Sequence, residues 1–251
     1  MKIGVFIHLY HIDMLEQIKT YLENLKFDYE LHFSITQKYP KSFMDRLRRT
    51  NKVTHIHIVK NIGMDIGGFL QVYKETDKEY DLILKIHTKK GLGSKVRPSL
   101  HVVRHGTESA TQRGINWFKG LMHGVLGNEE KVTKIINEFK TNDDCGMVAS
   151  KRNTNFQKNR KFMDEVFSYM NVETDLLGHD FVGGTIFWVR GEIFKKYFTN
   201  EVIDKILDKS PEGYVHEPSM NHGMERVFGS LVHLEEKKLY IIKWDTLLLQ
   251  E

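Results

Sequence analysis

The chain is 251 residues long, which is short for two full domains and suits one α/β domain. Hydrophobic residues make up 40% of it and charged residues 28%, so its composition excludes both a disordered and a fibrous protein. The formal net charge of +4 is too small to indicate a nucleic-acid-binding protein, although it is compatible with anionic ligands or lipid headgroups.

Cysteine usage and the length of the apolar runs narrow the cellular setting. Cys145 is the only cysteine, which excludes an internal disulfide and a cysteine-based zinc site. The longest apolar runs, such as IGVFIHLY and TIFWV, are far shorter than the roughly 20 residues of a membrane-spanning helix. The opening residues, MKIGVFIHLYHID, lack the small-residue cleavage site of a secretory signal. We therefore expect a cytoplasmic protein.

The first part of the chain alternates between strand and helix patterns. Continuous or period-2 apolar runs predict strands at 2–10, 28–35, 53–60 and 81–88, and amphipathic patterns predict helices at 14–25, 43–49 and 68–76. This order is typical of βαβ units around a mostly parallel sheet flanked by helices, a Rossmann-like α/β fold. We assign residues 1–90 to a nucleotide-binding half.

The pattern changes after residue 90. Glycines, a proline and scattered basic residues predict an exposed, mobile loop at 90–110. Further helices are expected at 114–126, 129–140, 156–170, 191–198, 200–208 and 224–236, with strands at 145–150, 181–189 and 240–244. We treat 1–251 as a single domain, with 91–251 as its second half.

Polar clusters follow the predicted strands, and ligands of open α/β sheets bind where strands end. The first cluster is HLYHID, in which His8 and Tyr10 can line the pocket of a nucleotide base. Its structural alternative is a helix start capped by Asp13.

The second cluster, NIGMDIGGF, comes directly after the third strand. Asn61 and Asp65 can hydrogen-bond a ribose or a base, and Gly63 allows close approach of the backbone. A plain strand-to-helix turn explains the same residues, and the spacing matches neither G-x-G-x-x-G nor a P-loop.

The third cluster is basic and ends the fourth strand. Lys85, His87 and Lys89 alternate along the strand and so share a face, next to the basic loop at 95–104. Such a group suits a diphosphate, although a solvated basic edge is the alternative.

Five segments taken together, HLYHID, NIGMDIGGF, DLILKIHTKK, FVGGTIFWVR and HGMERVFG, resemble in matching order the rhamnan synthesis protein F family. Members of this family are associated with bacterial surface polysaccharide assembly and include rhamnosyl- and galactofuranosyltransferase-like domains. The resemblance covers nearly the whole chain. It implies a GT-A-like glycosyltransferase, or hexosyltransferase, that moves galactofuranose or rhamnose from a nucleoside diphosphate, such as UDP, to a growing glycan with inversion.

The resemblance also implies partners. The donor is a nucleoside-diphosphate sugar, the acceptor is a glycan or a lipid-linked glycan, and basic segments at 95–104 and 158–161 suit peripheral contact with the inner face of the cell membrane. An ordinary solvated surface explains the basic segments equally well. No nucleic-acid motif is present.

Metal dependence is in doubt because one motif departs from the GT-A pattern. Enzymes of that fold usually hold Mn²⁺ or Mg²⁺ with Asp-x-Asp at the end of the fourth strand, where this chain reads His87-Thr88-Lys89. A lysine offsets phosphate charge without a metal, so we expect Lys89 and its basic neighbours to take the place of the ion.

The strand FVGGTIFWVR resembles the acceptor side of GT-A enzymes. Gly183, Gly184 and Thr185 let a sugar lie against the backbone, and Trp188 offers an aromatic face. Burial in the core is the more common fate of such a tryptophan. Asp180 precedes the strand and is placed to reach an acceptor.

The resemblance places the catalytic base in HGMERVFG. Glu225 matches the acidic residue of GT-A enzymes that takes the proton of the acceptor hydroxyl, and His222 on the same helical face is its competitor. A Glu–Arg pair that ties the helix to the sheet is the structural alternative. The rival function is a non-catalytic nucleotide-sugar or glycan-binding module of a polysaccharide assembly complex.

Overall fold

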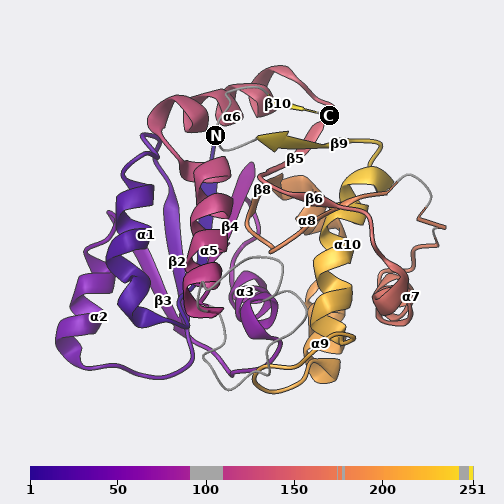
Figure 1. Cartoon of the computed structure of the whole chain (residues 1–251), viewed down its shortest axis with the longest axis horizontal. Helices are drawn as coiled ribbons and strands as arrows, with labels where there is room; N and C mark the ends of the chain where they lie inside the picture. The colour runs from indigo at the N-terminus through magenta and orange to yellow at the C-terminus, as the bar shows by residue number, and fades with distance from the viewer. Residues whose placement is uncertain (91–109, 174, 177–178, 243–248, 251) are drawn as a thin grey trace.

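The structure is a computed structural model that describes residues 1–250 except 91–109, 174, 177–178 and 243–248 (Figure 1). The basic loop expected at 90–110 falls almost wholly outside these residues.

Eight strands form one twisted sheet at the centre of the molecule. They are β1 (Ile3–His8), β2 (Glu30–Ile35), β3 (Val53–Ile58), β4 (Leu82–His87), β5 (Cys145–Ala149), β8 (Phe187–Arg190), β9 (Lys238–Ile242) and β10 (Leu249–Gln250). Their order across the sheet is β10-β9-β5-β8-β4-β1-β2-β3. β1 to β4 are mutually parallel where they pair, β5 is parallel to β9, and β8 and β10 run antiparallel to their neighbours. The predicted mostly parallel α/β sheet is confirmed.

Helices cover both faces of the sheet (Figure 1). One face is covered by α1 (Leu15–Leu22), α2 (Lys41–Arg48), α5 (Ala110–Leu126) and α6 (Glu129–Thr141). The other face is covered by α3 (Met64–Glu75), α7 (Arg160–Tyr169), α8 (Gly191–Tyr197), α9 (Asn200–Lys209) and α10 (Met220–Leu234). Two 3-10 turns, Ile12–Met14 and Gln157–Asn159, precede α1 and α7. Because apolar side chains alternate between the two faces of each strand, the sheet carries a separate core on each side.

The strands differ in burial as their places in the sheet require. All six residues of β1 and of β4 are buried, since both strands lie inside the sheet with helices on either face. β3 is the outer strand beyond β2, and exposed residues recur along it. These buried runs carry the cluster residues to one edge of the sheet.

The predicted strand at 181–189 is wrong, because the chain breaks there into two strands. β7 (Phe181–Val182) pairs with β6 (Arg152–Asn153) in a separate two-stranded sheet, and only β8 joins the main sheet. Between them Gly184 and Thr185 have φ angles of 93° and 52°, which lie in the left-handed region and end an extended strand. The break turns a predicted strand into a tight turn.

Three helices begin about four residues earlier than predicted. α3 begins at Met64 rather than 68, α5 at Ala110 rather than 114, and α10 at Met220 rather than 224. Two of the glycines in NIGMDIGGF, Gly67 and Gly68, lie inside α3, and Gly63 is the residue that precedes the helix. A Cβ on Gly68 would lie 2.1 Å from Nδ1 of His8, so glycine lets the helix pack tightly on β1.

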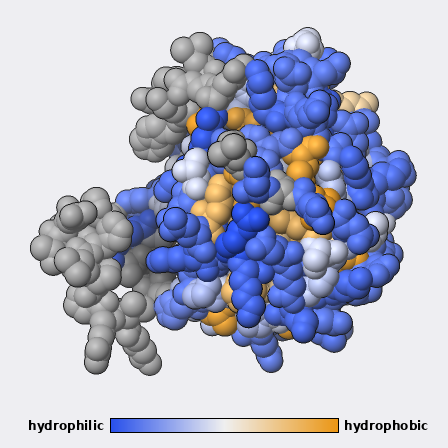
Figure 2. All heavy atoms as spheres, turned by 90° about the vertical axis from the view of Figure 1, so that its right-hand side faces the viewer, coloured by the Kyte–Doolittle hydropathy of each residue, from blue (hydrophilic) through white to orange (hydrophobic). Residues whose placement is uncertain are grey.

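One face of the molecule is predominantly hydrophilic, with smaller apolar areas between the polar residues (Figure 2). Within the described part of the chain, no helix combines the length and the apolar character that crossing a membrane requires.

Candidate active site

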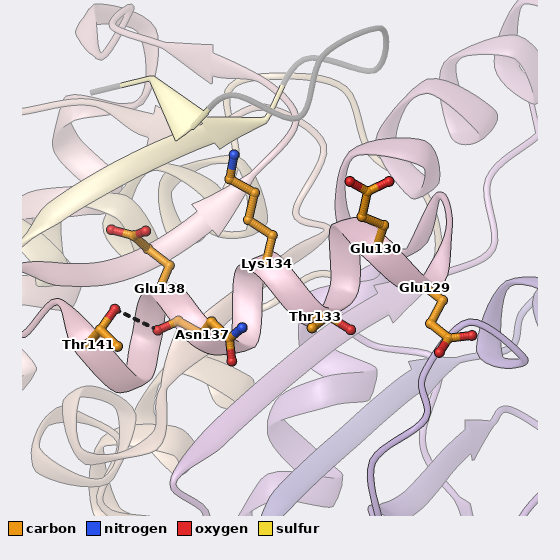
Figure 3. Close-up of a pocket in the computed structure, with 7 residues that line it drawn as sticks. All are labelled: Glu129, Glu130, Thr133, Lys134, Asn137, Glu138 and Thr141. Carbon is orange, nitrogen blue, oxygen red and sulfur yellow. Dashed lines mark hydrogen bonds between the residues drawn. The ribbon is translucent and has the colours of Figure 1, made fainter.

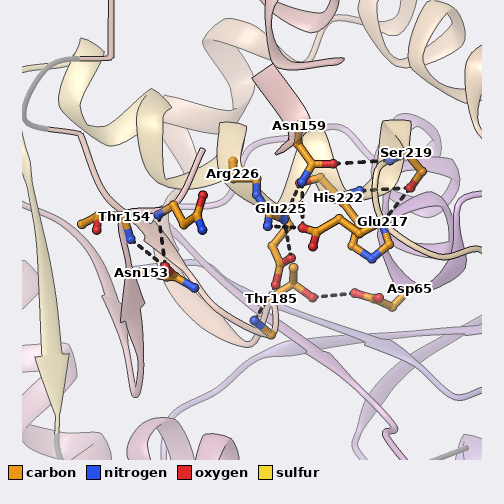
Figure 4. Close-up of polar contacts among 12 residues, drawn as sticks. Asp65, Asn153, Thr154, Asn159, Thr185, Glu217, Ser219, His222, Glu225 and Arg226 are labelled. Carbon is orange, nitrogen blue, oxygen red and sulfur yellow. Dashed lines mark hydrogen bonds and ion pairs between the residues drawn. The ribbon is translucent and has the colours of Figure 1, made fainter. Parts of the chain in front are cut away.

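Polar side chains from three segments converge on the turn between β7 and β8, which we call the glycine turn (Gly183–Thr185). They come from the first turn of α3, the end of β4 and the first half of α10. Figure 4 shows Asp65 of α3 and the residues of α10 around Thr185. These segments lie far apart in the sequence, so only the fold brings their side chains together.

Asp65 and Lys85 are the centre of this network. Nζ of Lys85 donates to Oδ2 of Asp65 at 2.7 Å, and also to the carbonyl oxygen and Oγ1 of Thr185 at 3.0 and 3.1 Å. Oγ1 of Thr185 in turn donates to Oδ2 of Asp65 at 2.6 Å. The side chain of Lys85 is 1% exposed and that of Asp65 is 20% exposed. The pair therefore locks β4, α3 and the glycine turn together.

Burial and charge act in opposite directions on this pair. Burial by itself would raise the pKa of Asp65, but the charges of His87 and Lys85, with hydrogen bonds from Lys85 and Thr185, hold that pKa well below its usual range. Burial lowers the pKa of Lys85, and the negative charge of Asp65 opposes this shift. Asp65 is therefore an ionised carboxylate whose negative charge is balanced by the ammonium group of Lys85.

His87 forms a hydrogen bond to the backbone of the glycine turn. Its Nε2 donates to the carbonyl oxygen of Gly184 at 2.8 Å, and the same nitrogen lies 3.8 Å from Oδ2 of Asp65. Burial is the main reason that the pKa of His87 is lowered. The turn that His87 supports is strained, because a β-branched residue such as Thr185 rarely adopts a positive φ. Backbone strain of this kind clusters at functional sites.

Glu225 holds the other side of the same turn. Its Oε1 accepts from the backbone amide of Gly184 at 2.7 Å, and its Oε2 accepts from Nη1 of Arg226 at 3.0 Å. Arg226 also pairs with Glu217, whose Oε1 accepts from Nδ2 of the buried Asn159 at 2.7 Å. Both carboxylate oxygens of Glu225 are thus occupied by protein donors (Figure 4).

His222 lies one turn before Glu225 on α10. Its Nδ1 is 2.7 Å from Oγ of Ser219, the residue that caps this helix, and its ring extends toward Asp65 in Figure 4. Burial lowers the pKa of His222, while the charges of Glu225 and Glu217 oppose that shift. The imidazole is consequently neutral and oriented at neutral pH, which is the state that a general base requires.

Trp117 of α5 lies against the glycine turn, and the sequence analysis missed it. A Cβ on Gly184 would lie 3.5 Å from its ring, and the side chain of Trp117 is 42% exposed. Nζ of Lys89 lies 3.9 Å and Nζ of Lys151 5.4 Å from the ring centroid. A partly exposed aromatic ring with two ammonium groups over it fits a ligand that combines a ring with phosphate. In the sequence Trp117 is part of a Trp-Phe pair inside a helix, a pattern that predicts two buried core residues.

Asn221 is a second residue that the predicted site did not include. It is 1% exposed, and within the described residues neither its Nδ2 nor its Oδ1 has a hydrogen-bond partner. A Cβ on Gly63 would lie 3.3 Å from Oδ1 of Asn221, so the amide sits where the starts of α3 and α10 meet. Buried amides without hydrogen-bond partners are rare. The side chain of Asn221 therefore adds an unpaired polar group to the site at this junction.

Four predicted donor-binding residues lie apart from this centre or beneath it. His8 is 5% exposed under α3, with its Nδ1 2.9 Å from Oγ of Ser34. Tyr10 is 50% exposed beside His11. The backbone of Asn61 and Gly63 pairs with residues 211–213. Lys89 lies over Trp117 and close enough to His87 for its charge to lower the pKa of that ring. Asp65, His87 and Lys89 are therefore neighbours, and the predicted meeting of Asn61 with them stays a prediction.

Two predicted site residues on the acceptor side are engaged elsewhere. Trp188 is fully buried and its Nε1 donates to the carbonyl oxygen of Val125 at 3.0 Å, so the acceptor role proposed for it is wrong and it belongs to the core. Asp180 forms an ion pair with Arg152 at 2.8 Å and lies 2.6 Å from Nε2 of His233. The ion pair with Arg152 balances the charge of this carboxylate, and the catalytic role of Asp180 stays a prediction.

Among the described residues, the two carboxylates at the glycine turn do not fit Mn²⁺ or Mg²⁺, which prefer several carboxylate or carbonyl oxygens. Asp65 already accepts from the ammonium group of Lys85 and from Thr185, and a buried cation 2.7 Å away repels a metal ion. Glu225 accepts from Gly184 and Arg226. Neither carboxylate has the open charge that a divalent ion needs.

A hollow of about 630 Å³ lies elsewhere on the surface, along α6 (Figure 3). Its lining consists of Glu129, Glu130, Thr133, Lys134, Asn137, Glu138 and Thr141. All of these come from one helix, so the hollow is a helix surface and lacks the convergent groups of a binding site.

Comparison with protein families matches residues 1–237 to the family described as rhamnan synthesis protein F. The match covers nearly the whole chain. A search of curated proteins found no match.

Proposed function

The chain belongs to the rhamnan synthesis protein F family, and on that premise we propose that it is a glycosyltransferase that uses a nucleoside-diphosphate sugar. Family membership indicates a role in polysaccharide synthesis. The glycine turn carries the finer proposal, because aromatic, basic and acid–base side chains from α3, α5 and α10 meet around it.

The donor binds across Trp117 and the glycine turn. The exposed ring stacks on the base or the sugar, and the ammonium groups of Lys89 and Lys151 beside that ring face the diphosphate. Lysine charge then offsets the charge that develops on the departing diphosphate, as a metal ion does in other transferases. This arrangement needs no divalent ion at Asp65.

His222 is the better candidate for the base, and Glu225 is a positioning residue. A carboxylate that already accepts from an amide and an arginine is a weak base. Among the described residues, the ring of His222 forms a hydrogen bond through Nδ1 alone. The role requires the tautomer in which Nδ1–H donates to Ser219 and Nε2 carries the lone pair.

The reaction is a single displacement. The acceptor hydroxyl oxygen forms a bond to the anomeric carbon while the bond from that carbon to the diphosphate oxygen breaks. The hydroxyl proton passes to Nε2 of His222, and the nucleoside diphosphate leaves with the electron pair. Attack opposite the leaving group inverts the anomeric centre. A lipid-linked acceptor would bring the chain to a membrane surface.

The test is titration of the purified chain with UDP and dTDP, followed by transfer assays with UDP-galactofuranose and dTDP-rhamnose. Saturable binding of one nucleotide, and turnover that is lost in His222→Gln while binding is retained, support a transferase. Nucleotide-sugar binding without any turnover, equal in the wild type and in His222→Gln, supports a non-catalytic binding module instead.

A further inference from the structure

A cluster of three histidines lies at the outer edge of the sheet, on β2 and β3. His32 of β2 is paired in register with His55 of β3, and His57 follows two residues later on the same face of the strand. The ring of His32 stacks on that of His55 with centroids 4.7 Å apart, and its centroid is 5.6 Å from that of His57. We call His32, His55 and His57 the edge histidines.

A carboxylate fixes the proton of His57. Nδ1 of this ring lies 2.8 Å from Oε2 of Glu75 on α3. An ionised carboxylate only accepts hydrogen bonds, so Nδ1 must carry the proton that it donates. In the neutral ring the other nitrogen, Nε2, is left with a lone pair.

Tyr80 fixes the proton of His32 in the same way. The hydroxyl of Tyr80 has a single proton and donates it to Oε2 of Glu30 at 2.9 Å. The contact of 2.8 Å between this hydroxyl oxygen and Nε2 of His32 is then donated by the ring. Neutral His32 therefore carries its lone pair on Nδ1.

The two lone pairs face each other. Nδ1 of His32 lies 3.3 Å from Nε2 of His57, and the proton count leaves no hydrogen between them. Two nitrogens bound to one tetrahedral Zn²⁺ by bonds of about 2.0–2.1 Å lie about 3.3–3.4 Å apart. Metal-bound histidines also usually donate their other N–H to a carboxylate or a similar acceptor, as His57 does to Glu75.

We propose that the edge histidines bind a divalent ion of the zinc class. Nδ1 of His32 and Nε2 of His57 are the first two ligands, and His55 turns in as the third. The ligand atoms of Glu30, His32 and His55 lie within 4.8 Å of one another, so a carboxylate and a second imidazole lie near His32. Imidazole nitrogens suit zinc, copper and nickel. His55 is exposed on an edge strand, which gives the ion a route from solvent.

This site is separate from the transfer site and does not depend on the proposed function. The edge histidines join β2 to β3, and Glu75 links them to α3. A bound ion therefore stabilises the outer edge of the sheet, in proportion to its occupancy.

Calorimetric titration of the full chain with ZnCl₂, above the ordinary imidazole pKa of about 6.5, tests the proposal. We expect one equivalent to bind to the wild type and binding to be lost in His57→Ala. Glu75→Ala removes only the acceptor of the Nδ1–H of His57 and should weaken zinc binding roughly 10- to 100-fold. His216→Ala, which changes an exposed histidine beside Tyr214, is the matched control and should bind as the wild type does.

Three results would overturn the proposal. They are a wild-type chain that takes up no zinc, a His57→Ala variant that binds as tightly as the wild type, and an equal loss in His216→Ala. If His57→Ala does not fold, unchanged affinity in Glu75→Ala has the same meaning, because Glu75 is 64% exposed and its replacement leaves the core intact.

Discussion

Nζ of Lys85 and Oδ2 of Asp65 lie 2.7 Å apart in an ion pair that joins the end of β4 to the first turn of α3. Removing one partner of a buried pair leaves an uncompensated charge inside the protein. We expect Lys85→Met to lower the free energy of unfolding by about 3–5 kcal/mol. Denaturant titration followed by circular dichroism measures this change.

Two further variants separate the ion pair from a general effect of losing a lysine. Asp65→Asn combined with Lys85→Met leaves no unpaired charge and should recover part of the loss. Lys74→Met breaks the pair with Asp204, whose side chains are 34% and 52% exposed, and should cost less than about 1 kcal/mol. Equal losses at Lys85 and Lys74 would contradict the assignment of a special role to the buried pair.

The second prediction concerns the assignment of the base. His222→Gln should lower kcat roughly 10²- to 10⁴-fold with little change in donor affinity, because general base catalysis contributes about that much. Glu225→Gln still accepts from the amide of Gly184, so its kcat should fall by less than roughly tenfold. Steady-state transfer rates with saturating donor check both values. The reverse order of the two losses would assign the base to Glu225.

Trp117 leads to a prediction about donor affinity. Stacking of a nucleotide base on an aromatic side chain is worth about 1–3 kcal/mol, so Trp117→Ala should weaken nucleotide binding about 5- to 150-fold. Tyr10→Ala is the matched control, because Tyr10 is 50% exposed and Trp117 is 42% exposed. Fluorescence or calorimetric titration gives both constants. A loss confined to Tyr10→Ala would place the base at the end of β1.

The strands that build the site could be predicted from the sequence, because each is a buried apolar run of ordinary length. Their ends then indicated Asp65 and His87, which do lie together. Trp117 could not be found in this way. A tryptophan in an amphipathic helix is most often buried, and only the packing of α5 beside the glycine turn exposes its ring there.

The glycine turn shows a second limit of pattern reading. FVGGTIFWV has the composition of a strand. The pattern of its apolar residues contains no indication that Thr185 adopts a left-handed φ. The tertiary contacts of Thr185 with Asp65 and Lys85 stabilise that conformation. For the same reason the register that places Trp188 inward, beneath α5, was not visible in the sequence.

Acid should destabilise the protein through His8. Burial lowers the pKa of His8 to about 4, whereas an unfolded histidine has a pKa of about 6.5. Between these values the unfolded chain binds a proton that the folded chain does not, so the free energy of unfolding falls as the pH falls from about 6.5 toward 4. His8→Gln should flatten this fall by up to about 1.4 kcal/mol per pH unit. Urea titrations of both proteins across that range check the slope, and identical slopes would contradict the prediction.

The last prediction concerns metal ions, which we expect to be dispensable for sugar transfer but to stabilise the edge histidines. Asp65 and Glu225 are already neutralised by Lys85 and Arg226, so transfer should keep its full rate in a chelator and gain nothing from Mn²⁺ or Mg²⁺. The edge histidines are a different case. Stripping zinc from them should lower the thermal midpoint of unfolding, because an ion that binds only the folded state stabilises it.

The transfer rate and the thermal midpoint are independent measurements, and His57→Ala is the control for both. This variant should lose the thermal shift with zinc and keep the transfer rate, since His57 lies on β3 and two strands separate it from β4. A transfer rate that falls in chelator and returns with Mn²⁺ would contradict charge neutralisation by lysine. A second outcome is that zinc, and not Mn²⁺, restores the transfer rate of the wild type after chelation but does not restore that of His57→Ala. Zinc binding at the edge histidines would then affect the transfer reaction at the glycine turn.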